Sequence, residues 1–273
     1  MARAAATHGL RSVFISDLHL GSYRCNAPAL SNFLARTEPE SLYLVGDILD
    51  VWALRPGATL PSEHQDVARR IFELARLGTR VVLIPGNHDD VFLRLADMML
   101  PGIEVRRDCI VETGQGARYL VIHGHEQDAY FGSTGYVARV GSRIGERIGE
   151  IVHAVVSSRR EAERRPTAGR RLRVKRLVSG ASRFEQALAA EARSRGADGV
   201  ICGHLHVPAD ADIDGVHYLN CGDWLRHCSA VTEDTTGAMN LQYWPQRADV
   251  AAPAADALQP ICPAPDALEG EPA

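Results

Sequence analysis

The sequence predicts an α/β fold in which mixed β-sheets are flanked by helices. Three features carry this prediction. Short apolar runs rich in β-formers recur along the chain, a helical pattern separates early runs, and short glycine-containing turns separate late ones. The runs are Ser12–Ser16, Leu42–Val45, Val81–Ile84, Tyr119–Ile122, Gly199–Cys202, His217–Leu219 and Leu241–Trp244.

The early runs are expected to form a layered core. Between the second and third runs, apolar residues at positions 67, 68, 71, 72, 74 and 75 follow the spacing of one helix face. Alternation of strands and helices is typical of a sheet with helices packed on it.

The later runs are expected to add antiparallel hairpins to this core. Short turns that contain Asp-Gly or Gly separate them, and such turns favour hairpins. These runs are Ala209–Ile213, Val216–Leu219, Ser229–Val231 and Ala238–Trp244.

The chain is expected to form one domain over residues 12–247, with a flexible N-terminus at 1–11. The Ala- and Pro-rich acidic tail at 248–273 lacks periodicity and is predicted to be disordered. A helical cap insertion is predicted at about 131–196, where apolar residues from Val137 to Val155 follow a helical period. Gly141, Gly145 and Gly149 beside that stripe would allow close helix packing, within the insertion or in a homodimer.

The composition is that of a globular protein, since 45% of the 273 residues are hydrophobic and 23% are charged. It excludes disordered, collagen-like and disulfide-framework classes. No apolar run has the roughly 18 residues of a membrane span. The six cysteines are scattered and the start of the chain has no apolar leader region, so we expect reduced thiols and a cytoplasmic protein.

The net charge of −4 conceals a strongly basic stretch. Residues 130–180 contain twelve Arg or Lys and four Glu, a local charge of +8. Three interpretations are open: a solvated helix face or linker, peripheral contact with an anionic surface such as the inner membrane, and contact with nucleic acid. Nucleic acid is the least favoured, because no aromatic residues alternate with the basic ones.

Five short segments at the ends of predicted strands hold most of the residues suited to catalysis. In α/β sheets, ligands bind beyond the carboxyl ends of strands, so we expect the segments to converge. Their imidazoles and carboxylates suit Mn²⁺, Fe, Zn²⁺ or Co²⁺, and their glycines would permit close backbone approach. The segments are Ser16–His19, Gly46–Asp50, Gly86–Asp89, His123–His125 and Gly203–His206.

The series D-x-H, G-D-x-x-D, G-N-H-D, H-G-H and G-H-x-H resembles the signature of the calcineurin-like metallophosphoesterases. The resemblance implies a four-layer αββα sandwich and two divalent metal ions, with Mn²⁺ expected and Fe, Zn²⁺ or Co²⁺ as alternatives. By position, it implies that one ion is held by Asp17, His19, Asp47 and His206, and the other by Asp47, Asn87, His123 and His204. Asp47 would bridge the two ions.

The resemblance also implies the chemistry of the site. Two ions roughly 3.5–4 Å apart can activate water near neutral pH and clamp an in-line displacement at phosphorus. His88 would protonate or stabilise the leaving oxygen, and Asp50 would orient a ligand. A non-catalytic scaffold is disfavoured because every ligand position is filled.

A closer similarity, to the UDP-2,3-diacylglucosamine pyrophosphatase family, lies in segments 46–52, 61–67, 78–81, 84–89, 198–204 and 220–224. It implies cleavage of a lipid-linked nucleotide of lipid A synthesis to UMP and a lipid monophosphate, under a helical cap. His64 and Asp66 lie in the second segment and are expected near the substrate.

The chain departs from the family at two positions. His88 stands where the better-known branch has Arg, so the chain follows the second branch, whose substrates are less uniform. That branch usually reads His-Gly-Asp where this chain has His123-Gly124-His125. We expect His125 to support a ligand or contact substrate phosphate. Binding a third metal ion and a role in the turn alone are the alternatives. A nucleotide phosphodiesterase or nuclease with the same metal site is the second functional hypothesis.

Overall fold

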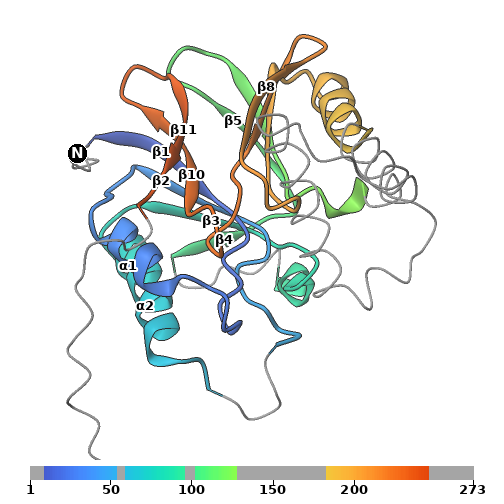
Figure 1. Cartoon of the computed structure of the whole chain (residues 1–273). Helices are drawn as coiled ribbons and strands as arrows, with labels where there is room; N and C mark the ends of the chain where they lie inside the picture. Colours follow the sequence, from blue (N-terminus) through green and yellow to red (C-terminus); the bar gives the residue numbers. More distant parts are fainter. Residues whose placement is uncertain (1–8, 54–58, 96–101, 128–182, 246–273) are drawn as a thin grey trace, which may run out of the picture.

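The computed structural model describes residues 9–53, 59–95, 102–127 and 183–245 (Figure 1). A further helix covers residues 183–194. The named elements are β1 (Leu10–Ile15), α1 (Ala27–Ala35), β2 (Ser41–Val45), α2 (Ser62–Arg76), β3 (Arg80–Ile84), the 3₁₀ helix η1 (Asp90–Leu95), β4 (Ile103–Val105), β5 (Cys109–Glu112), β6 (Arg118–Val121), β7 (Gly199–Cys202), β8 (Ala209–Ile213), β9 (Val216–Asn220), β10 (Ser229–Asp234) and β11 (Met239–Tyr243).

The strands form two mixed sheets. The first has the order β11-β10-β1-β2-β3-β4 and the second has the order β5-β6-β7-β9-β8. Strands β1 to β4 run parallel, as do β6, β7 and β9, whereas the outer hairpin strands pair antiparallel. The first sheet therefore brings the carboxyl ends of four neighbouring parallel strands to one edge and the second sheet those of three, where the loops after them can meet.

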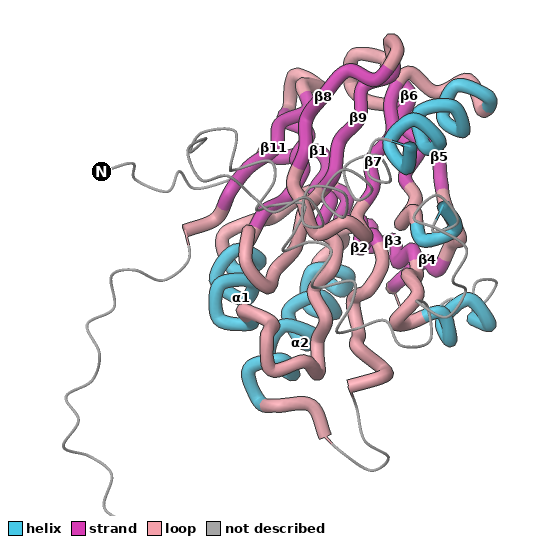
Figure 2. The backbone as a smooth tube through the Cα atoms, turned by 45° about the vertical axis from the view of Figure 1, so that its right-hand side comes forward, coloured by secondary structure: helices cyan, strands magenta, loops and turns pink. Residues whose placement is uncertain are grey.

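Three apolar clusters divide the fold into four layers. Ile15 lies with residues of α1 and α2 on one face of the first sheet. Phe14 points to the opposite face and lies with Val121 between the two sheets. Val200, on the outer face of the second sheet, lies with the helix at 183–194. The helices accordingly stand on opposite sides of the paired sheets (Figure 2), which confirms the predicted αββα sandwich.

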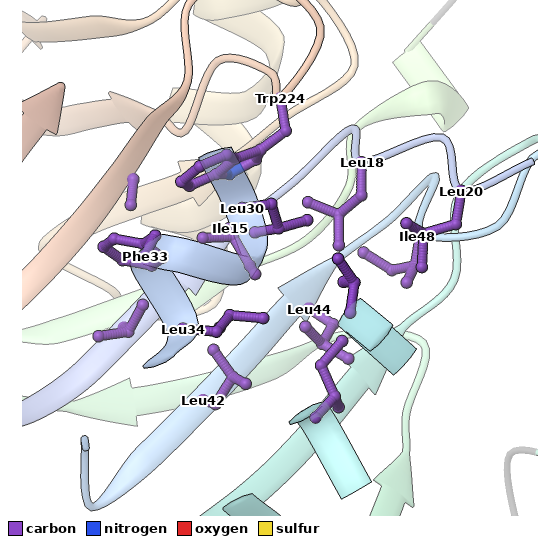
Figure 3. Close-up of a cluster of buried hydrophobic side chains, with 14 of the residues drawn as sticks. Ile15, Leu18, Leu20, Leu30, Phe33, Leu34, Leu42, Leu44, Ile48 and Trp224 are labelled. Atoms are coloured by element: carbon purple, nitrogen blue, oxygen red, sulfur yellow. The ribbon is translucent and has the colours of Figure 1, made fainter. Parts of the chain in front are cut away.

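The first of these clusters extends into the loops that follow the strands. Leu18, Leu20, Ile48 and Trp224 lie beyond β1, β2 and β9, yet their side chains are buried in the same cluster as those of α1 and α2 (Figure 3). Each of these loops is thus fixed to the core by an apolar side chain.

The structure confirms the predicted strands within a few residues at their ends and the helix after the second of them, α2. It also confirms the late hairpins, β8–β9 and β10–β11. Four elements were not predicted: α1, η1, β4 and β5. Of the predicted insertion, only 183–194 is described as a helix. The predictions for residues 1–8, for 131–182 with its glycine stripe, and for the tail 248–273 lie outside the described residues.

The five cysteines in the described part of the chain carry free thiols, four of them buried. Within the same ranges, no helix combines the length and the apolar character that crossing a bilayer requires.

Candidate metal centre

Loops after five parallel strands gather the predicted ligands at one edge of the sandwich. Asp17 and His19 follow β1, Asp47 follows β2, Asn87 follows β3, His123 follows β6, and His204 and His206 follow β7. Contacts between the sheets show the convergence directly. The backbone N–H of His204 donates to Asp17 Oδ2 at 3.0 Å, and His123 Nε2 lies 3.6 Å from Asp47 Oδ1.

Five of these residues adopt the left-handed backbone conformation, which L-residues other than Gly rarely adopt. Their φ angles are 53° for Asp17, 48° for His19, 53° for Asp47, 67° for His204 and 57° for His206. Backbone conformations of this kind cluster at functional sites, where the surrounding structure over-determines them. Here all five lie in the loops that follow β1, β2 and β7.

Two glycines allow the loops to approach one another. A Cβ on Gly46 would overlap the ring of His123, and a Cβ on Gly86 would lie 2.6 Å from the backbone nitrogen of Asp47 and 2.7 Å from His123 Nε2. The prediction of close backbone approach at these glycines is confirmed.

The first predicted ligand set is compact. His206 Nε2 lies 3.2 Å from Asp17 Oδ1, and His19 Nε2 lies 3.9 Å from the same oxygen and 3.8 Å from Asp47 Oδ2. Ligand atoms bonded to one ion at about 2.1 Å stand roughly 3.0–3.5 Å apart. The set therefore needs only small side-chain movements to close on an ion.

The second set lies on the other side of Asp47. His123 Nε2 faces Asp47 Oδ1, and the His204 ring packs edge-on against that of His123 with centroids 5.3 Å apart. His123 Nδ1 lies 3.0 Å from the carbonyl oxygen of Val45. Because a carbonyl only accepts, Nδ1 carries the hydrogen, and in the neutral ring Nε2 is left with a lone pair for an ion.

The donor atoms of both sets meet a chemical test for a metal site. Asp17 Oδ1, His19 Nε2, Asn87 Oδ1 and His123 Nε2 are buried, and no hydrogen bond to another described residue satisfies them. Buried polar atoms are nearly always paired, so four orphaned atoms in one place need a partner of another kind. Oxygen and imidazole nitrogen are suitable ligands for a divalent transition metal. Several groups of three residues here have ligand atoms close enough together to hold one metal ion. Asp17, His19 and His206 form one such group.

His88 lies beside this cluster and is held by Asp50. His88 Nδ1 is 3.0 Å from Asp50 Oδ1, and its Nε2 is 3.9 Å from Asp47 Oδ2. Asp50 Oδ2 lies 3.8 Å from His19 Nδ1, so one carboxylate faces two imidazoles. The ring of Trp52 covers His88, with centroids 4.1 Å apart.

Charge interactions outweigh burial in the pKa values of the cluster. Burial alone would raise the pKa of Asp47, but His123, His19 and His88 hold it well below its usual value. Burial would lower the pKa of His123, yet Asp47 raises it to about 10. For His206, burial is likewise outweighed, by Asp17 and Asp223, and the pKa rises to about 9. Without a metal ion, the rings of His123 and His206 are therefore in the cationic, doubly protonated form at neutral pH.

Two buried carboxylates support the site and had no role in the sequence-based assignment. Asp89 Oδ2 accepts from the backbone N–H of Ile48 at 2.7 Å and of Leu49 at 3.1 Å, while Oδ1 accepts from Gly86 N–H at 2.7 Å. It thereby ties the loop after β2 to the loop after β3. Asp223, in the loop after β9, lies 3.3 Å from His206 Nδ1 through its Oδ2. Both stand in motifs singled out from the sequence, but a carboxylate that holds a loop has no spacing pattern of its own.

Of the three residues predicted near the substrate, one lies at the ligand cluster and two lie on α2. His125 lies at the cluster, its ring centroid 5.5 Å from that of His123, and burial together with His123 lowers its pKa to about 4. His64 is buried on α2, where its Nδ1 accepts from Gly21 N–H at 2.9 Å. Asp66 is exposed on α2 and pairs with Arg69. A substrate contact by His64 or Asp66 stays a prediction.

Comparison with known proteins places this site in a family. Residues 10–208 match the family model of the calcineurin-like phosphoesterases. The chain is 29% identical over 247 residues to a UDP-2,3-diacylglucosamine hydrolase of Azotobacter vinelandii, covering 84% of this chain and 96% of that one. It is 28% identical over 239 residues to a protein of the same name from Stutzerimonas stutzeri, covering 82% and 95%.

Among solved structures, a phosphoesterase from E. coli is similar at 17% sequence identity and a TM-score of 0.41, covering 86% of this chain and 99% of that one. The family match covers strands β1 to β7 and the loops that carry the predicted ligands. The chain therefore belongs to the calcineurin-like phosphoesterases and is a hydrolase.

Proposed function

We propose that the protein is a dinuclear metal-dependent hydrolase that cleaves the pyrophosphate of UDP-2,3-diacylglucosamine to UMP and a lipid monophosphate. The observation that carries the metal-dependent part is the group of buried ligand atoms left without hydrogen bonds to described residues. The proposed substrate is supported by the two relatives named UDP-2,3-diacylglucosamine hydrolase, because the match to this chain covers nearly the whole length of each.

In this proposal, Asp47 contributes to both ion sites. Its Oδ2 faces His19 and its Oδ1 faces His123, and these imidazoles belong to the two different ligand sets. Asp17 and His206 complete the first set, while Asn87 and His204 complete the second. Bound ions would supply positive charge for a phosphate and lower the pKa of bound water, so that a nucleophile forms near neutral pH. Mn²⁺ is the ion we expect, and Fe, Zn²⁺ or Co²⁺ would suit the same ligands.

His88 is the proposed proton donor to the leaving oxygen. Burial would lower the pKa of His88, but Asp50 and Asp47 raise it, so the ring tends to keep its proton. Asp50 accepts from Nδ1 and so directs Nε2 toward the cluster, where a phosphate oxygen could take the proton. Asp50 and Trp52 would hold the ring in place from two sides.

A nucleotide phosphodiesterase or nuclease that uses the same ligands is the second candidate. The chemistry at phosphorus would be the same, since in-line displacement does not depend on what the leaving group carries. The two candidates differ in the group bound outside the cluster.

Hydrolysis assays with the Mn²⁺-loaded protein distinguish these functions. The substrates are UDP-2,3-diacylglucosamine, cyclic nucleotides, bis-p-nitrophenyl phosphate and single-stranded DNA. We expect UMP and a lipid monophosphate from the first, and in ¹⁸O-labelled water we expect the label in UMP, because attack falls on the α-phosphorus. Cleavage of DNA without turnover of the lipid nucleotide would overturn the first proposal in favour of the second.

Membrane contact through the basic stretch at 130–180 is a further part of the proposal. A substrate with acyl chains resides at a membrane, and basic residues are attracted to anionic lipids. Flotation with anionic vesicles should recover the protein at low salt, whereas neutral vesicles should not. Equal recovery with both would contradict the electrostatic interpretation. A homodimer through Gly141, Gly145 and Gly149 stays a prediction, to be checked by the mass of the protein in solution.

A further inference from the structure

Asp223 divides its carboxylate between two tasks. Its Oδ1 accepts from the backbone N–H groups of Leu225 at 3.3 Å, Arg226 at 2.9 Å and His227 at 2.8 Å, and so holds the turn after β9. Its Oδ2 lies 3.3 Å from Nδ1 of the predicted ligand His206. The side chain is buried, at 2% exposure, and the neighbouring Trp224 is fully buried in the core. The carboxylate is therefore fixed in position by groups that do not belong to the ligand sets.

The chemistry of a carboxylate decides the state of the His206 ring. An ionised carboxylate can only accept hydrogen bonds, so His206 Nδ1 must carry the hydrogen between them. When the ring is neutral, Nε2 then holds the lone pair. That atom lies 3.2 Å from Asp17 Oδ1, within the first ligand set. We propose that Asp223 is a positioning residue, which fixes His206 in the orientation and tautomer that present Nε2 to an ion.

The same arrangement recurs at the second set with a different acceptor. His123 Nδ1 faces the carbonyl oxygen of Val45, and its Nε2 faces Asp47. A backbone carbonyl cannot be removed by a side-chain substitution, whereas Asp223 can be changed. The role of an Nδ1 acceptor is therefore open to experiment at His206, and its effect should be confined to one of the two sites.

The inference rests on the dinuclear centre proposed above, and Asp223→Asn is its most direct test. Asparagine keeps an oxygen for the three backbone N–H groups but places an NH₂ group where Oδ2 stood. Turning the amide over would direct NH₂ at three N–H donors, so the turn selects the orientation with NH₂ toward His206. Facing a donor, Nδ1 must become the acceptor, and the hydrogen moves to Nε2, which is the wrong tautomer for binding an ion.

The measurement is Mn²⁺ binding by titration calorimetry on the full chain, with thermal unfolding alongside. We expect the wild type to bind two ions and Asp223→Asn to lose about 10- to 100-fold in affinity at one site only, as is typical when a ligand loses its supporting partner. Asp234→Asn is the matched control. Asp234 Oδ1 accepts from Thr236 N–H at 2.8 Å and Ala238 N–H at 3.1 Å in the β10–β11 turn, and none of the described residues that it contacts there is a histidine. It should leave both affinities unchanged.

The outcomes test the dinuclear centre and the role of Asp223 separately. If the wild type binds fewer than two ions, the proposed dinuclear centre fails. If the wild type binds two and Asp223→Asn binds two with equal affinity, the centre stands and the role of Asp223 is refuted. If Asp223→Asn weakens both sites equally and also lowers the unfolding temperature, Asp223 only holds the turn, and the positioning role is again refuted.

Discussion

Replacing Asp47 with asparagine tests the metal centre with little disturbance to the fold. Asp47 has φ = 53°, a conformation that costs an ordinary L-residue about 1–2 kcal/mol but that asparagine tolerates. Its Oδ1 accepts from His88 N–H at 2.9 Å, and the amide oxygen of asparagine can do the same. Asp47→Ala should abolish metal-dependent hydrolysis as well, but it adds backbone strain and leaves that buried N–H without its acceptor. The asparagine variant thus changes mainly the charge.

The expected effect follows from the two imidazoles that Asp47 faces. Oδ2 lies 3.8 Å from His19 Nε2 and Oδ1 lies 3.6 Å from His123 Nε2, so both ion sites would lose an anionic ligand. Loss of a group that merely supports a ligand lowers metal affinity or activity by about 10- to 100-fold. Applied to each of two ions, this gives a fall of about 10²- to 10⁴-fold, and Asp47 as a direct ligand should reach at least that range.

The assay is the rate of UMP release from UDP-2,3-diacylglucosamine at saturating Mn²⁺, with the number of bound ions measured on the same samples. Asp214→Asn is the matched control, because Asp214 has the same φ of 53° and lies exposed in the β8–β9 turn. It should retain full activity. An Asp47→Asn protein that keeps both ions and more than a tenth of the wild-type rate would refute the assignment of Asp47 as the shared ligand.

Three further predictions concern other parts of the site. Leu18→Ala should lower the free energy of unfolding by about 2–5 kcal/mol in chemical denaturation, because Leu18 is fully buried between Asp17 and His19; a loss under 1 kcal/mol would contradict its role in the core. His88→Ala should lower kcat by about 10²- to 10⁴-fold while two ions remain bound, and loss of an ion would instead make His88 a ligand. Since the pKa of His123 is raised to about 10 and that of His206 to about 9, ion binding at neutral pH must displace protons. Apparent affinity should therefore rise between about pH 6 and 9, and calorimetry in buffers of different ionisation enthalpy should detect the released protons; a flat profile would contradict these shifts.

Much of the fold could be predicted because its strands are apolar and its motifs are local. β7 and β8 have the bounds that the sequence predicts: β7 is a short, fully buried apolar run, and β8 alternates apolar residues with exposed Asp before an Asp-Gly turn. α1 escaped prediction because its sequence, APALSNFLA, is short and almost uniformly apolar, so no polar face marks the helical period. Its signals are the cap, where Asn26 accepts from Ala29 N–H, and a proline in the first turn.

The ligand residues could be predicted, but the groups that hold them could not. Asp17 and His19 can be recognised in the sequence as a pair two residues apart at the end of a predicted strand. Asp223 reaches His206 from a different strand, 17 positions along the chain. Only the pairing of β7 with β9 brings those two together, and pairing between distant strands has no local signature. The left-handed backbone conformations of the ligand residues could not be predicted for the same reason, because they depend on the residues that surround each loop.

The apolar side chains within the metal-binding loops have a consequence for how the site moves. Leu18 and Ile48 sit directly beside ligand residues and lie in the same cluster as the strands and α1. Such a loop cannot swing open without exposing core surface to water, so its opening should share the free energy of unfolding the whole layer. Ions would then enter and leave through small movements of side chains and not through loop opening. Any adaptation to different substrates would then involve segments other than these metal-binding loops.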